Sequence, residues 1–284
     1  MLSITDADGV AFSSVGEALD AVRQGQVTGA VVPIENSVEG GVSATLDKLV
    51  DGDPLMITGE VVIPVEFGLY VRPGTSLGDV ASVLTHGHAA AQCRDWLATM
   101  IPSAQVTEAG STAGAAKEVS DPASRYDAAI CARVAGQLYE LEELAYSIED
   151  NPGAVTRFVV ASRPGRLPER TGADKTTLVA YLHQDHPGAL LEILQQFAVR
   201  GVNLCRIESR PTKTLLGSYC FAIDAEGHLT DRRLTETLLG LHRICRDVIF
   251  LGSYPRADAQ PPDVRRGFDD ESFEEAQAWL ERLA

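Results

Sequence analysis

Four segments of the chain place polar side chains directly after an apolar run or at the start of one. They are Glu35-Asn36-Ser37, Thr85 with Gln92 behind it, Ser111-Thr112, and Thr156-Arg157-Phe158. In an open α/β sheet such positions lie at the carboxyl ends of the strands, where ligands bind. Hydroxyls and N–H groups at helix starts favour anions such as carboxylates. Each segment alone could be an ordinary cap or turn, but the four together predict a polar cleft for a carboxylate ligand.

The sequence has no recognisable motif for binding a metal or a nucleotide. The sequence contains no Gly-x-Gly-x-x-Gly, no P-loop and no His-Glu-x-x-His. The close histidine pairs, His86/His88 and His183/His186, lack a second pair of ligands at a suitable spacing. The cysteines are dispersed and are predicted to be free thiols: Cys93, Cys131, Cys205, Cys220 and Cys245. We therefore expect neither a metal nor a cofactor.

The elements that would position these segments alternate between strand-like and helix-like patterns over the first 160 residues. Short apolar runs at 30–32, 80–84 and 128–131 predict strands, whereas 89–100 and 112–119 predict helices. Such alternation indicates βαβ units with mostly parallel sheets. The polar segments would then meet at one sheet edge.

Residues 176–255 follow a different order after a Pro- and Gly-containing linker at 163–175. The predicted strands are Thr177–His183, Val202–Glu208, Leu216–Ala225 and Val248–Tyr254, with helices between the first and second and between the third and fourth. The order βαββαβ predicts a ferredoxin-like arrangement, with two helices on one face of a four-stranded antiparallel sheet. The tail from Ala257 predicts an amphipathic acidic helix.

The composition restricts the class of protein, its partners and its location in the cell. The 284 residues carry a formal net charge of −16, and 45% are hydrophobic, which is ordinary for a globular protein. A chain this acidic repels phosphate backbones, so nucleic acid is not an expected partner. No apolar run is long enough for a membrane span, and the N-terminus lacks signal-peptide features, so we predict a cytoplasmic protein.

An ordered set of short motifs resembles the prephenate dehydratase family. The set is Pro33-Ile34-Glu35-Asn36-Ser37, Gln92-Cys93, Ser111-Thr112-Ala113 and Thr156-Arg157-Phe158. Behind it, Gly188-Ala189-Leu190-Leu191 and Glu208-Ser209-Arg210-Pro211 are similar to the amino-acid-binding motifs of ACT regulatory domains. The resemblance covers about residues 10–255.

The resemblance implies an α/β protein with two domains. The catalytic domain, 1–165, would have two lobes like a type II periplasmic binding protein. A linker, 166–175, would lead to a ferredoxin-like ACT domain at 176–256 and an acidic tail at 257–284. The sequence has no Gly-Pro-x-Gly-Thr-Phe-Thr/Ser loop, with which relatives open. We therefore expect a catalytic domain that is incomplete at its N-terminus and lacks the first strand.

The resemblance also implies an activity, the decarboxylating dehydration of prephenate to phenylpyruvate in L-phenylalanine biosynthesis, with no cofactor. By match to Thr-Arg-Phe, Thr156 is the implied hydrogen-bond donor to the departing hydroxyl. Acid assistance of this kind is worth about 10²–10⁴ in rate. A carboxylate at Glu35 would repel a dianion unless it were protonated or had a supporting role. The implied substrate-binding residues are Glu35, Asn36, Ser37, Thr85, Gln92, Ser111, Thr112, Arg157 and Phe158.

Regulation is implied by the ACT motifs. The resemblance predicts feedback inhibition by L-phenylalanine and a homodimer or homotetramer formed through the ACT domains. The implied effector-binding residues are Gly188, Ala189, Leu190, Leu191, Asn203, Glu208, Ser209, Arg210 and Pro211. Two alternatives stay open, a non-catalytic phenylalanine-binding sensor with a degenerate lobe pair and a dehydratase acting on arogenate.

Overall fold

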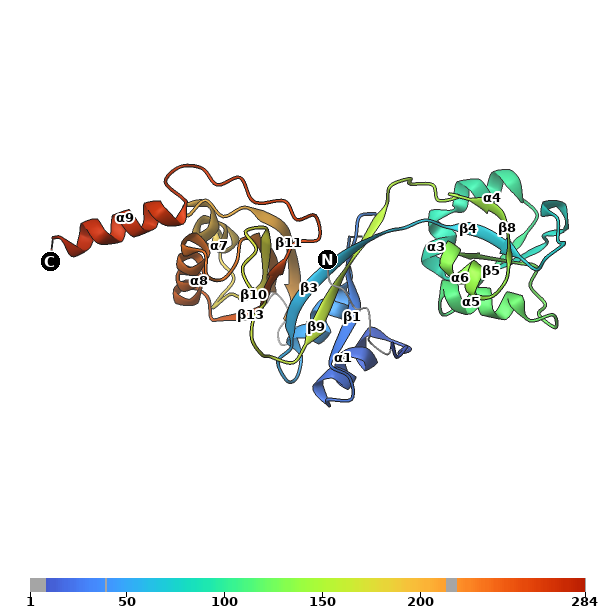
Figure 1. Cartoon of the computed structure of the whole chain (residues 1–284), viewed down its shortest axis with the longest axis horizontal. Coiled ribbons are helices and arrows are strands. Elements are labelled where there is room, and N and C mark those ends of the chain that lie inside the picture. The colour runs from blue at the N-terminus through green and yellow to red at the C-terminus, as the bar shows by residue number, and fades with distance from the viewer. Residues whose placement is uncertain (1–8, 39, 213–218, 284) are drawn as a thin grey trace. The chain divides into compact units, whose positions relative to one another are not determined.

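The computed structural model describes residues 9–38, 40–212 and 219–283, and the chain divides into two compact units (Figure 1). The first unit comprises residues 1–62 and 157–284, and the second comprises residues 63–156. The chain therefore passes between the units twice, at 62–63 and at 156–157. Within the described residues, no helix is both long and apolar enough to cross a membrane.

The first unit contains two sheets. The first sheet has the strand order β2-β1-β9-β3 and consists of β1 (Gly29–Asn36), β2 (Gly40–Gly41), β3 (Met56–Pro64) and β9 (Val155–Ser162). The helices α1 (Val15–Arg23) and α2 (Ser43–Val50) pack on it. In α1, Ser14 caps the start, Leu19 and Val22 are buried, and Gly25 ends the helix with φ +72°, as predicted.

The second sheet has the element order that the sequence predicts, βαββαβ. Its elements are β10 (Asp174–Tyr181), α7 (Ala189–Ala198), β11 (Leu204–Pro211), β12 (Tyr219–Glu226), α8 (Arg232–Ile244) and β13 (Asp247–Pro255). The strand order is β11-β12-β10-β13, and all three pairings are antiparallel. The third strand, predicted from Leu216, begins at Tyr219, because residues 213–218 lie outside the described residues.

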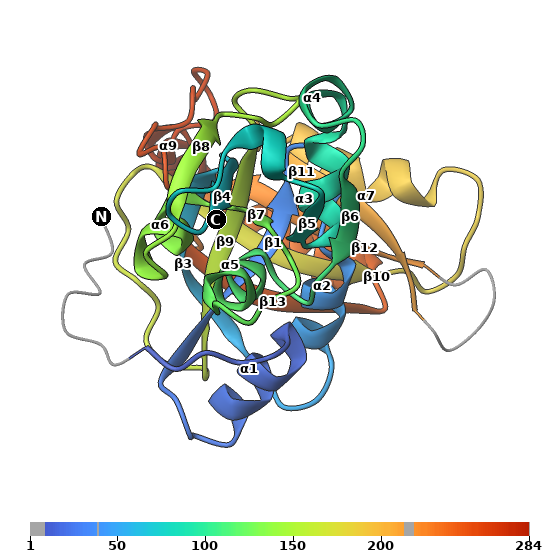
Figure 2. The same ribbon diagram turned by 90° about the vertical axis from the view of Figure 1, so that its right-hand side faces the viewer.

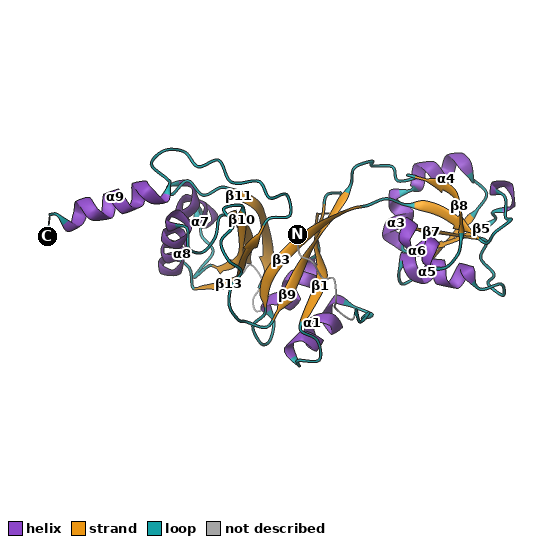
Figure 3. Cartoon of the chain, in the orientation of Figure 1, coloured by secondary structure: helices purple, strands orange, loops and turns teal. Residues whose placement is uncertain are grey.

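Each face of this second sheet is buried by a different partner. Leu178 and Ala180 of β10 pack with α7 and α8, whereas Val179 between them joins a core shared with the first sheet. Leu19, Val32, Ile57 and Val159 of the first sheet and its helices lie in that shared core with Val179, Ala222 and Leu251. Figure 3 shows α7 and α8 on one side of the second sheet and β1, β3 and β9 on the other. Because of this shared core, residues 1–62 form one compact unit with residues 176–256, and residues 63–156 form the other unit.

The second unit is built on a five-stranded sheet with the order β6-β5-β7-β4-β8. Figure 2 shows this unit facing the viewer. Its strands are β4 (Gly68–Val71), β5 (Ser82–Thr85), β6 (Gln105–Glu108), β7 (Ala128–Cys131) and β8 (Glu142–Tyr146). Its helices are η1 (Leu77–Asp79), α3 (Gly87–Gln92), α4 (Arg94–Met100), α5 (Thr112–Ser120) and α6 (Arg133–Leu138).

Two predictions for the second unit are wrong in detail. The sheet is mixed, because β5 runs parallel to β6 and β7 while β4 runs antiparallel to β7 and β8. A buried apolar run fits either direction, so its residue pattern does not encode strand polarity. The helix predicted over 89–100 is two helices, which meet at Cys93, where φ is −119°.

The tail after the second sheet ends in α9 (Asp270–Glu281), the helix that the sequence predicts. Asp269 caps it by accepting the backbone N–H of Ser272 at 2.9 Å. Asp270 accepts the backbone N–H of Arg232 at the start of α8, so the first turn of α9 is fixed to the second sheet's helix layer.

Candidate functional site

In the second unit, two of the predicted polar segments lie together at the carboxyl ends of β5 and β6. These parallel strands pair Thr85 with Glu108 at their last residues, and the N–H of Ala109 donates to the carbonyl of Thr85 at 2.7 Å. α3 starts directly after β5 and α5 starts directly after β6. The starts of both helices therefore face the same sheet edge, as the sequence analysis expected.

Ser111 is the N-cap of α5. Its Oγ accepts the N–H of Gly114 at 2.9 Å, which leaves the hydroxyl proton available to a ligand. Thr112 is the first residue of the helix and is half-buried. The free N–H groups and the dipole of this nine-residue helix favour a negative charge at its start.

Gln92 lies at the end of α3 with its side chain largely buried. The N–H of Asp150 donates to the Gln92 carbonyl at 2.6 Å, and the Asp150 carboxylate accepts the N–H of Asp95. The segment that leads to Thr156 therefore starts beside α3 and α4.

The prediction that all four polar segments meet at one sheet edge is therefore wrong. Thr85 and Ser111-Thr112 lie at the β5–β6 edge of the second unit, whereas the segments that begin at Glu35 and Thr156 belong to β1 and β9 of the first sheet. Residue periodicity does not encode which strands pair into one sheet.

Thr85 has a structural contact at the end of β5. Its side chain is fully buried, and its hydroxyl donates to the carbonyl of Ile130 on β7 at 2.7 Å. The hydroxyl proton therefore fixes the end of β5 against β7. The sequence could not separate this role from ligand binding, because both require a small polar residue at the end of the strand.

In the first unit, the structure brings Glu35 and Arg157 together. Glu35 lies near the end of β1, and its Oε2 is 3.2 Å from Nε of Arg157 on the neighbouring strand β9. Glu35 is therefore paired with a cation and is not an isolated carboxylate. Asn36 accepts the N–H of Val38 through its Oδ1 at 2.8 Å, which shapes the turn that carries Ser37. Phe158 follows on β9 and is half-buried.

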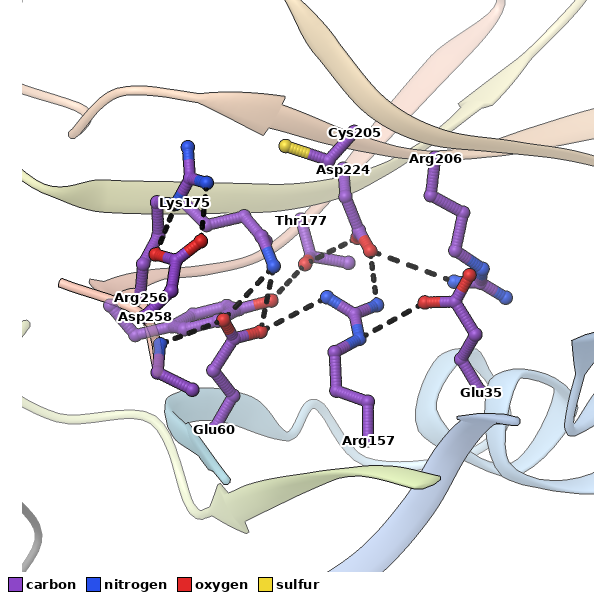
Figure 4. Close-up of polar contacts among 12 residues, drawn as sticks. Glu35, Glu60, Arg157, Lys175, Thr177, Cys205, Arg206, Asp224, Arg256 and Asp258 are labelled. Carbon is purple, nitrogen blue, oxygen red and sulfur yellow. Dashed lines mark hydrogen bonds and ion pairs between the residues drawn. The ribbon is translucent and has the colours of Figure 1, made fainter. Parts of the chain in front are cut away.

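Arg157 contacts protein carboxylates through all three guanidinium nitrogens. Nη1 is 3.0 Å from Oε2 of Glu60 on β3, and Nη2 pairs with Oδ2 of Asp224 on β12. Lys175 of β10 donates to both carboxylate oxygens of Glu60 at 2.9 Å. Figure 4 shows these side chains pointing toward one another between the two sheets. The structure thus directs the predicted substrate ligand Arg157 into the interior of the first unit.

Charge complementarity sets the ionisation of this cluster. Burial alone would raise the pKa of Asp224, but the charges of Arg157 and Arg206 outweigh it and lower that pKa below its ordinary value. Burial would likewise lower the pKa of Arg157, but the charge of Asp224 reverses the effect and raises it. Thr177 links Asp224, at 2.7 Å, to the hydroxyl of Tyr254, at 2.6 Å. Burial raises the pKa of Tyr254 well above its ordinary value, so this hydroxyl stays neutral.

The sequence analysis did not find Glu60, Lys175 or Asp224. One signal was present, because Asp224 interrupts the apolar strand Tyr219–Glu226, and a carboxylate there is expected to have a buried partner. Nothing in the sequence identifies that partner, since Arg157 and Asp224 are 67 residues apart.

The segment Gly74-Thr75-Ser76-Leu77-Gly78 has the Gly-x-Ser-x-Gly spacing of serine hydrolases. In the structure Ser76 caps the short helix η1, and its hydroxyl donates to Asp79 at 2.6 Å. A nucleophile elbow requires a tight turn from a strand into an α-helix. This segment is a capping box at the surface.

The predicted effector-binding residues divide between the two faces of the second sheet. The register opposes Glu208 with Ala222 and Arg210 with Cys220, whose side chains face the first sheet. Arg210 accordingly donates to Ser43 at 2.6 Å and pairs with Asp47 at 3.1 Å, both on α2. Ser209 opposes Phe221 and so faces the layer of α7. The Glu208–Pro211 motif therefore presents side chains to both faces of the sheet.

The other effector positions lie at the start of α7, where Ala189 is buried, and just before β11. Gly188 precedes α7 with φ +97°, a conformation that favours glycine, and Leu191 in the first turn is exposed. Asn203 is exposed just before β11, where its carbonyl accepts the N–H of Glu226 at 2.9 Å. Among described residues there is no cluster of His, Cys, Asp and Glu that could hold a metal ion. The described cysteines are free.

Comparison with known proteins identifies the family. Residues 1–166 match the family model for prephenate dehydratase. The prephenate dehydratase of Mycolicibacterium vanbaalenii is 46% identical over 277 residues, which cover 96% of this chain and 85% of that protein. The chain belongs to the prephenate dehydratase family.

Other members extend the likeness over the whole chain. The prephenate dehydratase of Amycolatopsis methanolica is 44% identical and covers 95% of this chain and 88% of its own length. The structure of the Arthrobacter aurescens prephenate dehydratase, in complex with L-Phe, has a TM-score of 0.93 and 51% identity. It covers all of this chain and 93% of that one. A structure described as a quorum quenching acylase, GqqA, is 31% identical, with a TM-score of 0.78, and covers 88% of this chain and 90% of its own.

Proposed function

We propose that this prephenate dehydratase family member converts prephenate to phenylpyruvate with Thr156 as the donor to the departing hydroxyl. Aromatisation of the ring drives the loss of carbon dioxide and water, so the protein needs orientation and hydrogen bonding and no redox group. The observation that carries this assignment is the family's Thr-Arg-Phe sequence at the start of β9, in a chain 46% identical to a named dehydratase.

The substrate carboxylates are assigned to uncharged donors. In the second unit these are Ser111, Thr112 and Gln92, supported by the start of α5. In the first unit they are Asn36 and Ser37, with Phe158 as an apolar contact. Glu35 and Arg157 form an ion pair with each other and are assigned a supporting role next to these donors. Thr85 fixes the strand end.

The test measures phenylpyruvate formation by wild type, Thr156→Ala and Thr156→Ser. We expect Thr156→Ala to lower kcat by about 10²–10⁴-fold, because the acid assistance is lost, while Thr156→Ser keeps a donor and loses far less. An unchanged kcat in Thr156→Ala would reject Thr156 as the donor. Paired kcat/KM values for prephenate and arogenate separate the two dehydratase alternatives.

The second sheet with α7 and α8 is proposed to be a ferredoxin-like ACT domain, residues 176–256, that binds L-phenylalanine and inhibits the enzyme. Gly188–Leu191, Asn203 and Ser209 are its proposed ligand-contacting positions, and Arg210 connects the Glu208–Pro211 motif to α2. β11 is an edge strand of the described sheet, which suits side-by-side pairing into a homodimer. Calorimetry that detects no phenylalanine binding at millimolar ligand would reject this regulatory role.

The remaining assignments follow the same reasoning. Residues 1–165 form the proposed catalytic domain, with two lobes like a type II periplasmic binding protein. Residues 166–175 form the linker and 257–284 the acidic tail. A biosynthetic role suits a cytoplasmic location.

A further inference from the structure

The buried charge cluster consists of Glu60, Arg157, Lys175 and Asp224. It lies beside both points at which the chain crosses between the two units. Glu60 is two residues before the crossing at 62–63, and Arg157 is the first residue after the crossing at 156–157. Both are on strands of the first sheet, β3 and β9, which are neighbours. The cluster can therefore fix the ends of β3 and β9 that lie next to the two crossings.

Both crossing residues are held by the second sheet. Asp224 of β12 pairs with Arg157, and Lys175 of β10 donates to both oxygens of Glu60. The Asp224 side chain is fully buried, and those of Glu60, Arg157 and Lys175 are at most 10% exposed. At this burial, replacing one partner leaves an uncompensated charge that must find a new position.

The cluster also reaches the proposed effector motif. Nη2 of Arg206 is 2.5 Å from Oε2 of Glu208, the first residue of Glu208-Ser209-Arg210-Pro211. Nη1 of Arg206 is 3.9 Å from Oδ2 of Asp224. Charged side chains thus form a series from Glu208 through Arg206 and Asp224 to Arg157, in which the 3.9 Å between Arg206 and Asp224 is the longest separation. Arg157 is bonded to Thr156 through the backbone, and in a strand the two side chains take opposite faces.

We propose that Asp224 and Lys175 are positioning residues for the dehydratase reaction, and that phenylalanine inhibits by altering their hold on Arg157 and Glu60. This inference rests on the proposed function. Any rotation of β9 at Arg157 moves the hydroxyl of Thr156, so the state of the second sheet sets the geometry of the donor. Buried ion pairs add little net stability, which suits a role in geometry.

Asp224→Asn is the direct test, because it removes the charge and keeps the size. We expect kcat without phenylalanine to fall by about 10–100-fold with KM changed less than about threefold, since only the donor's placement is lost. The ratio of the inhibitory phenylalanine concentration to the calorimetric Kd should rise by about 5–150-fold, the usual range of coupling between sites. Lys175→Gln should move the same quantities in the same direction.

Asp231→Asn is the matched control. Asp231 is also buried in the first unit, where it pairs with Arg170 and starts α8, away from the cluster. It should lose stability without the change in the inhibition ratio. Equal changes in both variants, or an Asp224→Asn enzyme with wild-type kcat and inhibition, would overturn the inference. Wild-type protein without turnover would instead reject the proposed function.

Hydrogen exchange of the wild-type protein supplies a test that needs no variant to fold. Saturating phenylalanine should change amide exchange at 57–61 and 156–161 by more than about threefold and leave α1 unchanged, because local opening is governed by local stability. Unchanged exchange in both segments with phenylalanine bound would overturn the inference.

Discussion

Individual side chains in this protein take roles that their sequence neighbours do not reveal. Glu35 and Arg157 both stand in motifs of the substrate site, yet they form an ion pair with each other. Two opposite charges in contact present less net charge to a dianionic ligand than either does alone. The pair therefore reduces the repulsion that an isolated Glu35 would exert on prephenate.

Thr85 is the residue where structural and ligand-binding roles can be separated. Thr85→Val keeps the shape but loses the hydroxyl that donates to Ile130, so the free energy of unfolding should fall by about 1–3 kcal/mol. The kcat/KM of the folded variant should stay within about threefold of wild type. Urea unfolding and steady-state kinetics measure the two quantities, with Thr85→Ser as the control that retains the bond. A large rise in KM at unchanged stability would return Thr85 to the substrate site.

At the scale of elements, the carboxyl edge of the second unit's sheet is built by parallel pairing of β5 and β6. Their common direction places the starts of α3 and α5 at one edge. The helix start of α5 then serves two purposes, since its cap residue stabilises the helix and offers a donor to an anion.

Ser111 tests both purposes with two substitutions. Ser111→Ala should lower the free energy of unfolding by about 1 kcal/mol and raise KM for prephenate, because cap and donor are both lost. Ser111→Asp should keep the stability, since aspartate caps as well as serine, yet raise KM further by repelling a dianion. Thermal unfolding and initial rates distinguish these outcomes. An Asp variant with wild-type KM would show that Ser111 is a cap and not a ligand.

At the scale of the whole chain, each unit is organised around its own sheets. In the first unit the two sheets approach each other closely between Gly252 of β13 and Ile57 of β3. A Cβ at Gly252 would lie 2.2 Å from the Ile57 carbonyl oxygen, and φ there is +137°. The shared core of the first unit therefore depends on a glycine at this contact.

Gly252→Ala should destabilise the protein by about 2–4 kcal/mol, the combined cost of backbone strain and overpacking. Gly172→Ala is the matched control in the same unit, because its φ is +85° but its Cβ would meet nothing within 4 Å. It should cost only about 1–2 kcal/mol. Chemical denaturation of both variants measures the difference. Equal losses would mean that the sheets do not approach closely at Gly252.

The sequence by itself determined the strands at 80–84 and 128–131, the helix at 112–119, the βαββαβ order of 174–255 and the family. These depend on hydrophobic periodicity, turn residues and motifs, which are local along the chain. Only the tertiary structure decided that β4 runs antiparallel, that Thr85 is buried, and that Arg157 meets Asp224 and Glu60. Those outcomes depend on which faces pack together. A buried charge chooses its partner by proximity in space, and that proximity exists only once distant strands have formed one core.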